Sequence, residues 1–228
     1  NSEDQKVFEW GVEGSAEGQF SKPAGVASDL AGHLYVVDAG NHRIQKFTSD
    51  GEFIHSWGEF GSERGQFNDP WGITVDSQGF VYVADWGNDR VQKFTGDGEW
   101  LQNFGVSSPD ALRLNHPSDV AVDSEGDVYV TDWGNKKVQI FDSDGEILTS
   151  LYGDATEFSR SAQNFLEVNQ DYYKAFKRAK DKSAIGLFAR PTSINVTKDD
   201  RIIICDATRQ RLQVYDKEKG YMDPEYNL

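Results

Sequence analysis

Apolar residues along this chain come in short runs, and each run is followed by a turn rich in glycine and aspartate. In the second of several similar segments, the runs predict strands over Gly72–Asp76, Val81–Asp85, Val91–Thr95 and Trp100–Gly105. Valine, isoleucine and aromatic residues dominate these runs, as is typical of β-strands. Within these segments, turn sequences such as Asp76-Ser77-Gln78-Gly79 come too often to leave room for helices. The pattern therefore predicts antiparallel sheets of four short strands.

This pattern is an internal repeat. Pro23, Pro70 and Pro117 follow one another at intervals of 47 residues, and Pro191 follows after 74. The segment Val36–Phe47 recurs as Val83–Phe94 and Val130–Phe141, with a looser fourth copy at Ile204–Tyr215. A period in the forties indicates an architecture in which each repeat is one supersecondary unit.

Four-stranded units repeated about a common axis form a β-propeller, in which closure of the ring protects the sheet edges. We therefore predict one all-β domain over residues 1–228, a β-propeller of four-stranded antiparallel blades. The segment Lys6–Gly11 is similar to the predicted outer strand in Glu52–Gly58, although it precedes the first full repeat. We expect Lys6–Gly11 to complete the last blade and close the ring.

An insertion over residues 154–186 separates the third repeat from the fourth. Its apolar positions alternate at intervals of four and three, which predicts an amphipathic helix near Ser159–Lys182. The stripe consists of Phe158, Ala162, Phe165, Asn169, Tyr172, Phe176 and Ala179. This helix either packs on the propeller or binds a partner. The candidate binding residues are Phe165, Tyr172, Phe176, Lys177 and Arg178.

Three recurring patterns resemble NHL repeats. They are the run Gly40–Phe47, the spacing of Pro23, Gly25 and Asp29 that returns as Pro70, Gly72 and Asp76, and the linker residues Phe60, Gly61, Gly65, Gln66 and Phe67. The resemblance covers Lys6 to about Tyr215 apart from the insertion. It implies a propeller, and the family commonly has six blades.

The resemblance implies several possible uses, because family members include extracellular sensors, RNA-binding modules, protein-interaction platforms and a few metal-dependent lyases. Four blades are visible in this sequence. Six blades of about 45 residues would need about 270 residues. The ring is therefore unusually small, or further blades lie outside this chain, or two chains cooperate.

The charge of the chain bears on its partners. With 38 acidic and 23 basic side chains, the net charge is −15, and this disfavours nucleic acid as the main ligand. No apolar stretch is long enough to predict a membrane span. The chain begins at Asn1, which we interpret as the start of a mature or trimmed product, and this favours a periplasmic or extracellular location.

The repeated carboxylates favour a structural role. Each repeat has an aspartate five positions before a basic residue, which is the spacing of a turn carboxylate that faces a cation. The pairs are Asp38 with Arg43, Asp85 with Arg90, Asp132 with Lys137 and Asp206 with Arg211. A catalytic role needed once would not require four copies, so we predict that these pairs support the scaffold.

Residues that break the repeat are better candidates for binding, because function concentrates where a rigid scaffold carries distinctive loops. Trp86 and Trp133 stand where other repeats have alanine, and Trp71 stands where they have alanine, serine or threonine. Exposed tryptophans anchor interfaces, but these three could equally cover neighbouring blades.

Catalytic candidates are sparse. The 4 histidines fall in different parts of the repeat and predict no zinc site, so no catalytic residue is assigned. A carboxylate-bound calcium is the one cofactor left open, because Asp119 lies at an inner-strand position where two other repeats have glycine. Asp119 is therefore the only candidate metal ligand.

The sequence favours a non-enzymatic propeller scaffold for protein–protein interaction, a subunit of a larger assembly. Its expected contacts are the helical insertion and the surface of Trp71, Trp86 and Trp133. Two alternatives stay open: a metal-dependent hydrolase or lyase with its site at the channel mouth, and an extracellular sensor of a small ligand.

Overall fold

The computed structural model describes residues 9–106, 112–153 and 187–217. These residues form four antiparallel sheets, which we call blades 1 to 4 in chain order. Blade 1 consists of β3 (Pro23–Ser28), β4 (Leu34–Asp38), β5 (Arg43–Phe47) and β6 (Phe53–Trp57). Blade 2 consists of β7 (Pro70–Val75), β8 (Val81–Asp85), β9 (Arg90–Phe94) and β10 (Trp100–Phe104).

The second half of the chain repeats this order. Blade 3 consists of β11 (Pro117–Val122), β12 (Val128–Asp132), β13 (Lys137–Phe141) and β14 (Ile147–Leu151). Blade 4 contains three described strands, β15 (Pro191–Val196), β16 (Arg201–Asp206) and β17 (Arg211–Asp216). The predicted strands of the second repeat are confirmed, with boundaries that differ by one or two residues.

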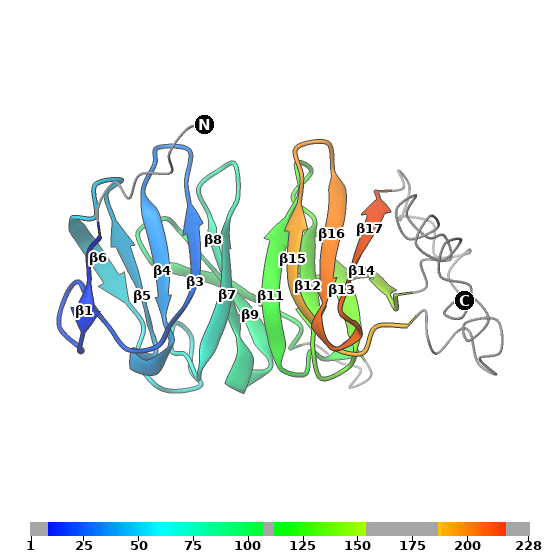
Figure 1. Cartoon of the computed structure of the whole chain (residues 1–228), viewed down its shortest axis with the longest axis horizontal. Coiled ribbons are helices and arrows are strands. Elements are labelled where there is room, and N and C mark those ends of the chain that lie inside the picture. The colour runs from blue at the N-terminus through cyan, green and yellow to red at the C-terminus, as the bar shows by residue number, and fades with distance from the viewer. Residues whose placement is uncertain (1–8, 107–111, 154–186, 218–228) are drawn as a thin grey trace, which may run out of the picture.

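The blades stand side by side in an arc, from β3–β6 at one end to β15–β17 at the other (Figure 1). The first strands of the blades line the inside of this arc, where β3 packs beside β7, β7 beside β11 and β11 beside β15. Blades 1 and 4 lie at opposite ends, so the described residues form no closed ring (Figure 1). The described residues alone therefore do not form the closed ring that the repeat predicts, and the three alternatives for its completion stay open.

The amino-terminal segment contacts blade 1 instead of blade 4. Its two short strands, β1 (Val12–Glu13) and β2 (Gln19–Phe20), pair with each other in parallel. Trp10, in the segment that we expected to complete the last blade, packs edge-on against Phe47 of blade 1, with ring centroids 6.0 Å apart. The rest of Lys6–Gly11 up to residue 8 lies outside the described residues.

The predicted helix near Ser159–Lys182 also lies outside the described residues, together with the whole insertion 154–186. The helical elements whose full bounds lie in the described ranges are single 3-10 turns, at η1 (Ala39–Asn41), η2 (Trp86–Asn88) and η4 (Ala207–Arg209). No helix in these ranges has the length and hydropathy needed to cross a membrane.

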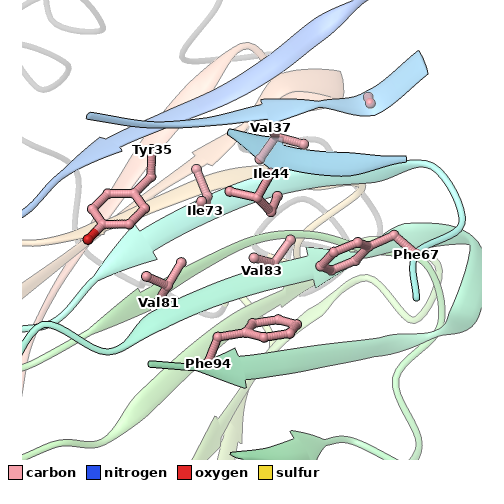
Figure 2. Close-up of a cluster of buried hydrophobic side chains, with 9 residues drawn as sticks. Tyr35, Val37, Ile44, Phe67, Ile73, Val81, Val83 and Phe94 are labelled. Atoms are coloured by element: carbon pink, nitrogen blue, oxygen red, sulfur yellow. The ribbon is translucent and has the colours of Figure 1, made fainter. Parts of the chain in front are cut away.

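Blades pack face to face because the second strand of each blade, which we call its central strand, is apolar on both sides. Alternate residues of a strand point to opposite faces, so Val81 and Val83 of β8 join the core between blades 1 and 2. Their neighbours Tyr82 and Ala84 join the core between blades 2 and 3. Figure 2 shows the first of these cores, in which Val37 and Ile44 of blade 1 meet Ile73 of blade 2.

Each blade also contains a buried polar network centred on its repeated aspartate. The carboxylate of Asp85 is fully buried and accepts hydrogen bonds from the Nε of Arg90 at 2.8 Å and the side-chain amide of Gln92 at 3.1 Å. Asn88 and the backbone N–H of Asn68 also donate to it. Burial raises the pKa of Asp85 above its ordinary value, and these donors oppose the rise.

Arg90 extends this network to the linker that enters blade 2. Its guanidinium donates to the backbone carbonyls of Ser62, Glu63 and Gln66, at 2.8–2.9 Å. Ion pairs of the same kind join Arg43 to Asp38 and Arg211 to Asp206. The predicted structural role of these aspartate–arginine pairs is thereby confirmed in blades 1, 2 and 4, where the arginine also donates to a backbone carbonyl of the segment that precedes the blade.

A second kind of tether joins the end of blade 4 to blade 3. The Nζ of Lys217 lies 2.6 Å from Asp123, 2.8 Å from Glu125 and 2.9 Å from Asp127. Burial alone would raise the pKa of Asp123, but hydrogen bonds from Lys217 and from the hydroxyl of Tyr129 hold the pKa below its ordinary value. Asp123 therefore stays ionised at mildly acidic pH.

We predict that Asp85→Ala lowers the free energy of unfolding by about 3–5 kcal/mol, because Arg90 would remain buried without its carboxylate. Urea denaturation followed by circular dichroism measures this loss. Asp97→Ala is the matched control, since its carboxylate pairs with Lys46 but is 90% exposed, and such pairs contribute about 0–1 kcal/mol. Equal losses in the two variants would contradict the structural role of the network.

We predict that Asp123→Asn lowers the free energy of unfolding by about 2 kcal/mol at pH 7. Unfolded Asp123 takes up a proton near pH 3.8, whereas the folded carboxylate does so at lower pH. Its stabilisation is therefore complete above pH 3.8 and is lost as the pH falls through the folded pKa. Urea unfolding between pH 7 and pH 3 should show the difference from wild type shrinking with acidification, and a constant difference would refute this assignment.

Candidate binding surface

The turns after the second strand of blades 2 and 3 place a tryptophan on one rim of the arc. Trp86 begins η2 directly after Asp85, and Trp133 directly follows Asp132 in the next blade. Both aspartates are fully buried, so each turn is held at its base by a carboxylate while the indole lies further out. The equivalent residue of blade 1 is Ala39, which is buried.

The structure brings together the three tryptophans that the sequence singled out. Trp71, at the second position of β7, stacks on Trp86 with ring centroids 5.7 Å apart and an interplanar angle of 12°. Trp86 in turn meets Trp133 at 6.4 Å with an angle of 61°. These are favourable geometries for aromatic pairs. A continuous indole surface thus runs from blade 2 to blade 3.

Two residues that sequence reasoning missed complete this surface. The ring of His116 lies 4.1 Å from that of Trp86, and the guanidinium of Arg190 lies 4.4 Å over Trp133. Each directly precedes the proline that begins an inner strand, Pro117 or Pro191. That shared position was the available signal, because it places each residue beside the turn of the preceding blade. We call Trp71, Trp86, His116, Trp133 and Arg190 the rim aromatic cluster.

The rim aromatic cluster is partly buried between blades and partly exposed to solvent. Trp86 and Trp133 are half-buried, whereas Trp71 is 40% exposed and Arg190 is exposed. Trp86 contributes to blade-to-blade contact through His116, whose backbone N–H also donates to Asp89 at 2.7 Å. The tryptophans therefore cover neighbouring blades and also present an exposed surface, so each of the two interpretations describes part of the geometry. The other predicted binding residues, Phe165, Tyr172, Phe176, Lys177 and Arg178, lie outside the described residues.

A groove of about 570 Å³ runs along the inside of the arc, lined by the four inner strands β3, β7, β11 and β15. Asp119 of β11 lies in its wall. One carboxylate oxygen accepts from Ser193 at 2.7 Å and from the backbone N–H of Ile194 at 3.0 Å, and the other from the backbone N–H of Val120 at 2.9 Å. Burial raises the pKa of Asp119, and these donors oppose the rise.

These contacts make Asp119 a link between β11 and β15. A Cβ on Gly72, the equivalent residue of blade 2, would lie 2.5 Å from the Cα of Asp119, so the inner strands approach too closely there for a larger side chain. Within the described ranges, no three His, Cys, Asp or Glu side chains lie together as metal ligands would. Calcium binding through Asp119 stays a prediction.

The histidines do not converge on a site in the described residues. The Nδ1 of His33 lies 2.9 Å from Asp29 in a turn, and the ring of His55 stacks on Trp57 at 6.0 Å on an outer strand. His42 packs against Phe60 in a linker, and His116 belongs to the rim aromatic cluster. Each has a separate local role.

Comparison with known families settles the nature of the repeat. The family model described as NHL repeat matches residues 20–47, 67–94 and 114–141. These three segments are NHL repeats. Each match begins in the segment before the inner strand and ends with the third strand of blades 1, 2 and 3 in turn.

Curated relatives match this chain over about the length of one repeat. It is similar to the B-box type zinc finger protein ncl-1 of Caenorhabditis elegans, with 48% identity over 48 residues, and to E3 ubiquitin-protein ligase TRIM71 of Rattus norvegicus, with 43% over 49 residues. These matches cover 21% and 22% of the chain and only 5% and 6% of the relatives. The matches therefore support the assignment of the repeat, and they give no information about the activity of the whole relatives.

Solved structures are similar to this chain over most of its length. A streptogramin B lyase structure matches with a TM-score of 0.56 at 15% identity, covering 89% of this chain and 57% of its own. A protein of unknown function from Bacteroides thetaiotaomicron matches with a TM-score of 0.58 at 18% identity, covering 85% of this chain and 47% of its own. At these identities, the likeness shows the propeller fold alone.

Proposed function

We propose that this NHL-repeat chain is a non-enzymatic scaffold, a subunit of a larger assembly, that binds a protein partner through the rim aromatic cluster. The observation that carries the proposal is the stack of Trp71 on Trp86, because it exposes a large, rigid aromatic surface on a scaffold whose polar networks fix its position. Tryptophan and arginine are the residues most enriched among strong interface contacts.

The relatives support the same class of function. The matched segments are about as long as one repeat and form a small part of much longer chains, as expected of a module within a larger protein. The net charge of −15 supports a protein partner in preference to nucleic acid, since phosphate backbones require basic contacts. A basic partner surface would be favoured by long-range attraction.

We predict that Trp71→Ala weakens partner binding by about 30-fold, the effect of losing an interface anchor worth about 2 kcal/mol. Proteins captured on the wild-type chain would be quantified by mass spectrometry beside those captured on Trp71→Ala and on Phe60→Ala. Phe60 is the matched control, because it is 66% exposed and outside the cluster. Thermal melting would show that both variants remain folded.

The proposal fails if a partner binds all three proteins equally, or if it is lost only from Phe60→Ala. A metal assay on the purified chain tests the enzymatic alternative, and stoichiometric calcium or zinc would favour that alternative. The groove beside Asp119 is the feature that favours a small-ligand sensor, and a ligand that protects the groove strands from hydrogen exchange would support it.

A further inference from the structure

Three junctions between blades follow one rule. In each, an apolar residue at the second position of a third strand shares a buried core with an apolar residue at the fourth position of the next inner strand. The three pairs are Ile44 with Ile73, Val91 with Val120, and Val138 with Ile194. All six side chains are between 0% and 7% exposed.

At the two ends of the arc, the residues at these two strand positions are exposed to solvent. Leu212 of β17 is the blade 4 counterpart of Ile44, since it lies opposite Cys205 as Ile44 lies opposite Val37, and it is 66% exposed. Val214, two residues further along β17, is 54% exposed. Blade 4 therefore presents an apolar face of the kind by which blades 1, 2 and 3 contact the next blade.

Val26 of β3 is the blade 1 counterpart of Ile73, because it lies opposite Val36 as Ile73 lies opposite Val83. Its side chain is 67% exposed, whereas that of Ile73 is 7% exposed. Blade 1 therefore presents the complementary face, the kind by which blades 2, 3 and 4 receive the preceding blade.

Blade 1 already carries part of a normal junction. The ring of Phe20 lies 5.6 Å from that of Phe47, with an interplanar angle of 45°. Phe67 and Phe94 have the same distance and angle in blade 2, where a preceding blade is present. The linker side of the junction is thus formed on blade 1. The face of blade 1 that would receive the apolar face of a preceding blade is exposed.

We propose that a second copy of this chain supplies that face: blade 4 of one copy docks on blade 1 of the other, with Leu212 against Val26, and two such junctions close a ring. Leu212 belongs to β17 in blade 4 and Val26 to β3 in blade 1, and these two blades lie at opposite ends of the molecule (Figure 1). The chain covers 47% of the Bacteroides protein and 57% of the lyase, so one copy accounts for about half of each of these single chains.

The contact is heterologous, because two different surfaces meet, and it closes when the rotation per copy is half a turn. Each copy carries a net charge of −15, so long-range repulsion opposes the association. Added salt screens this repulsion and should strengthen the dimer. A contact dominated by surface ion pairs would show the opposite salt dependence.

Light scattering coupled to size exclusion tests the proposal on the 228-residue chain. The expected mass is twice the 25.6 kDa of one copy, with the dimer fraction rising with concentration and with salt. Leu212→Asp and Val26→Asp should each abolish the closed dimer, because they place a charge in an apolar junction. Leu30→Asp is the control, since Leu30 is 88% exposed on a turn and should leave the dimer intact.

Mixing the two variants identifies the heterologous contact. The Leu212→Asp chain keeps an intact blade 1 face and the Val26→Asp chain an intact blade 4 face, so an equimolar mixture should form one junction and recover a dimer that neither chain forms alone. Melting curves matching that of the monomeric wild type would show that both variants fold. A wild-type mass of one copy at all concentrations would overturn the proposal, as would a dimer insensitive to both substitutions or a species larger than two copies.

Discussion

Each central strand of this protein must be apolar on both faces, and the rest of the structure depends on that constraint. Val81 and Tyr82 are adjacent in β8 but belong to different cores, one toward blade 1 and the other toward blade 3. A blade buried on both sides cannot place polar residues in the middle of its central strand. Most buried polar side chains are therefore confined to the strand ends and the aspartate networks.

This confinement explains where recognition is possible. The aspartate networks hold the turns at one rim, and Asp85 and Asp132 each precede a tryptophan that lies beyond the buried layer. The turn of blade 1 has the small Ala39 at this position, so the repeat itself does not require an indole there. A fixed backbone with variable turn residues gives a scaffold whose contacts can change without altering its core.

Much of the fold could be predicted from the sequence because the repeat shows every local rule several times. The four strands of blade 2 and the pairing of Asp85 with Arg90 depend on spacing within one repeat, and both predictions were confirmed. The contacts of His116 and Arg190 with tryptophans depend on how one blade is placed against the next, which spacing alone does not give. Spacing also leaves open how the ring is completed, since this depends on the angle accumulated over all the blades.

Hydrogen exchange of the central strands tests most directly whether blades are stabilised by their neighbours. In the Leu212→Asp chain, amides of β8 and β12, which are covered on both faces, should exchange more slowly than those of β16, which has a neighbouring blade on one side. Mass spectrometry of peptides from the three strands would measure the difference. Equal exchange in β8, β12 and β16 would mean that each blade is stable without its neighbours, and would contradict the claim that burial on both faces holds the blades together.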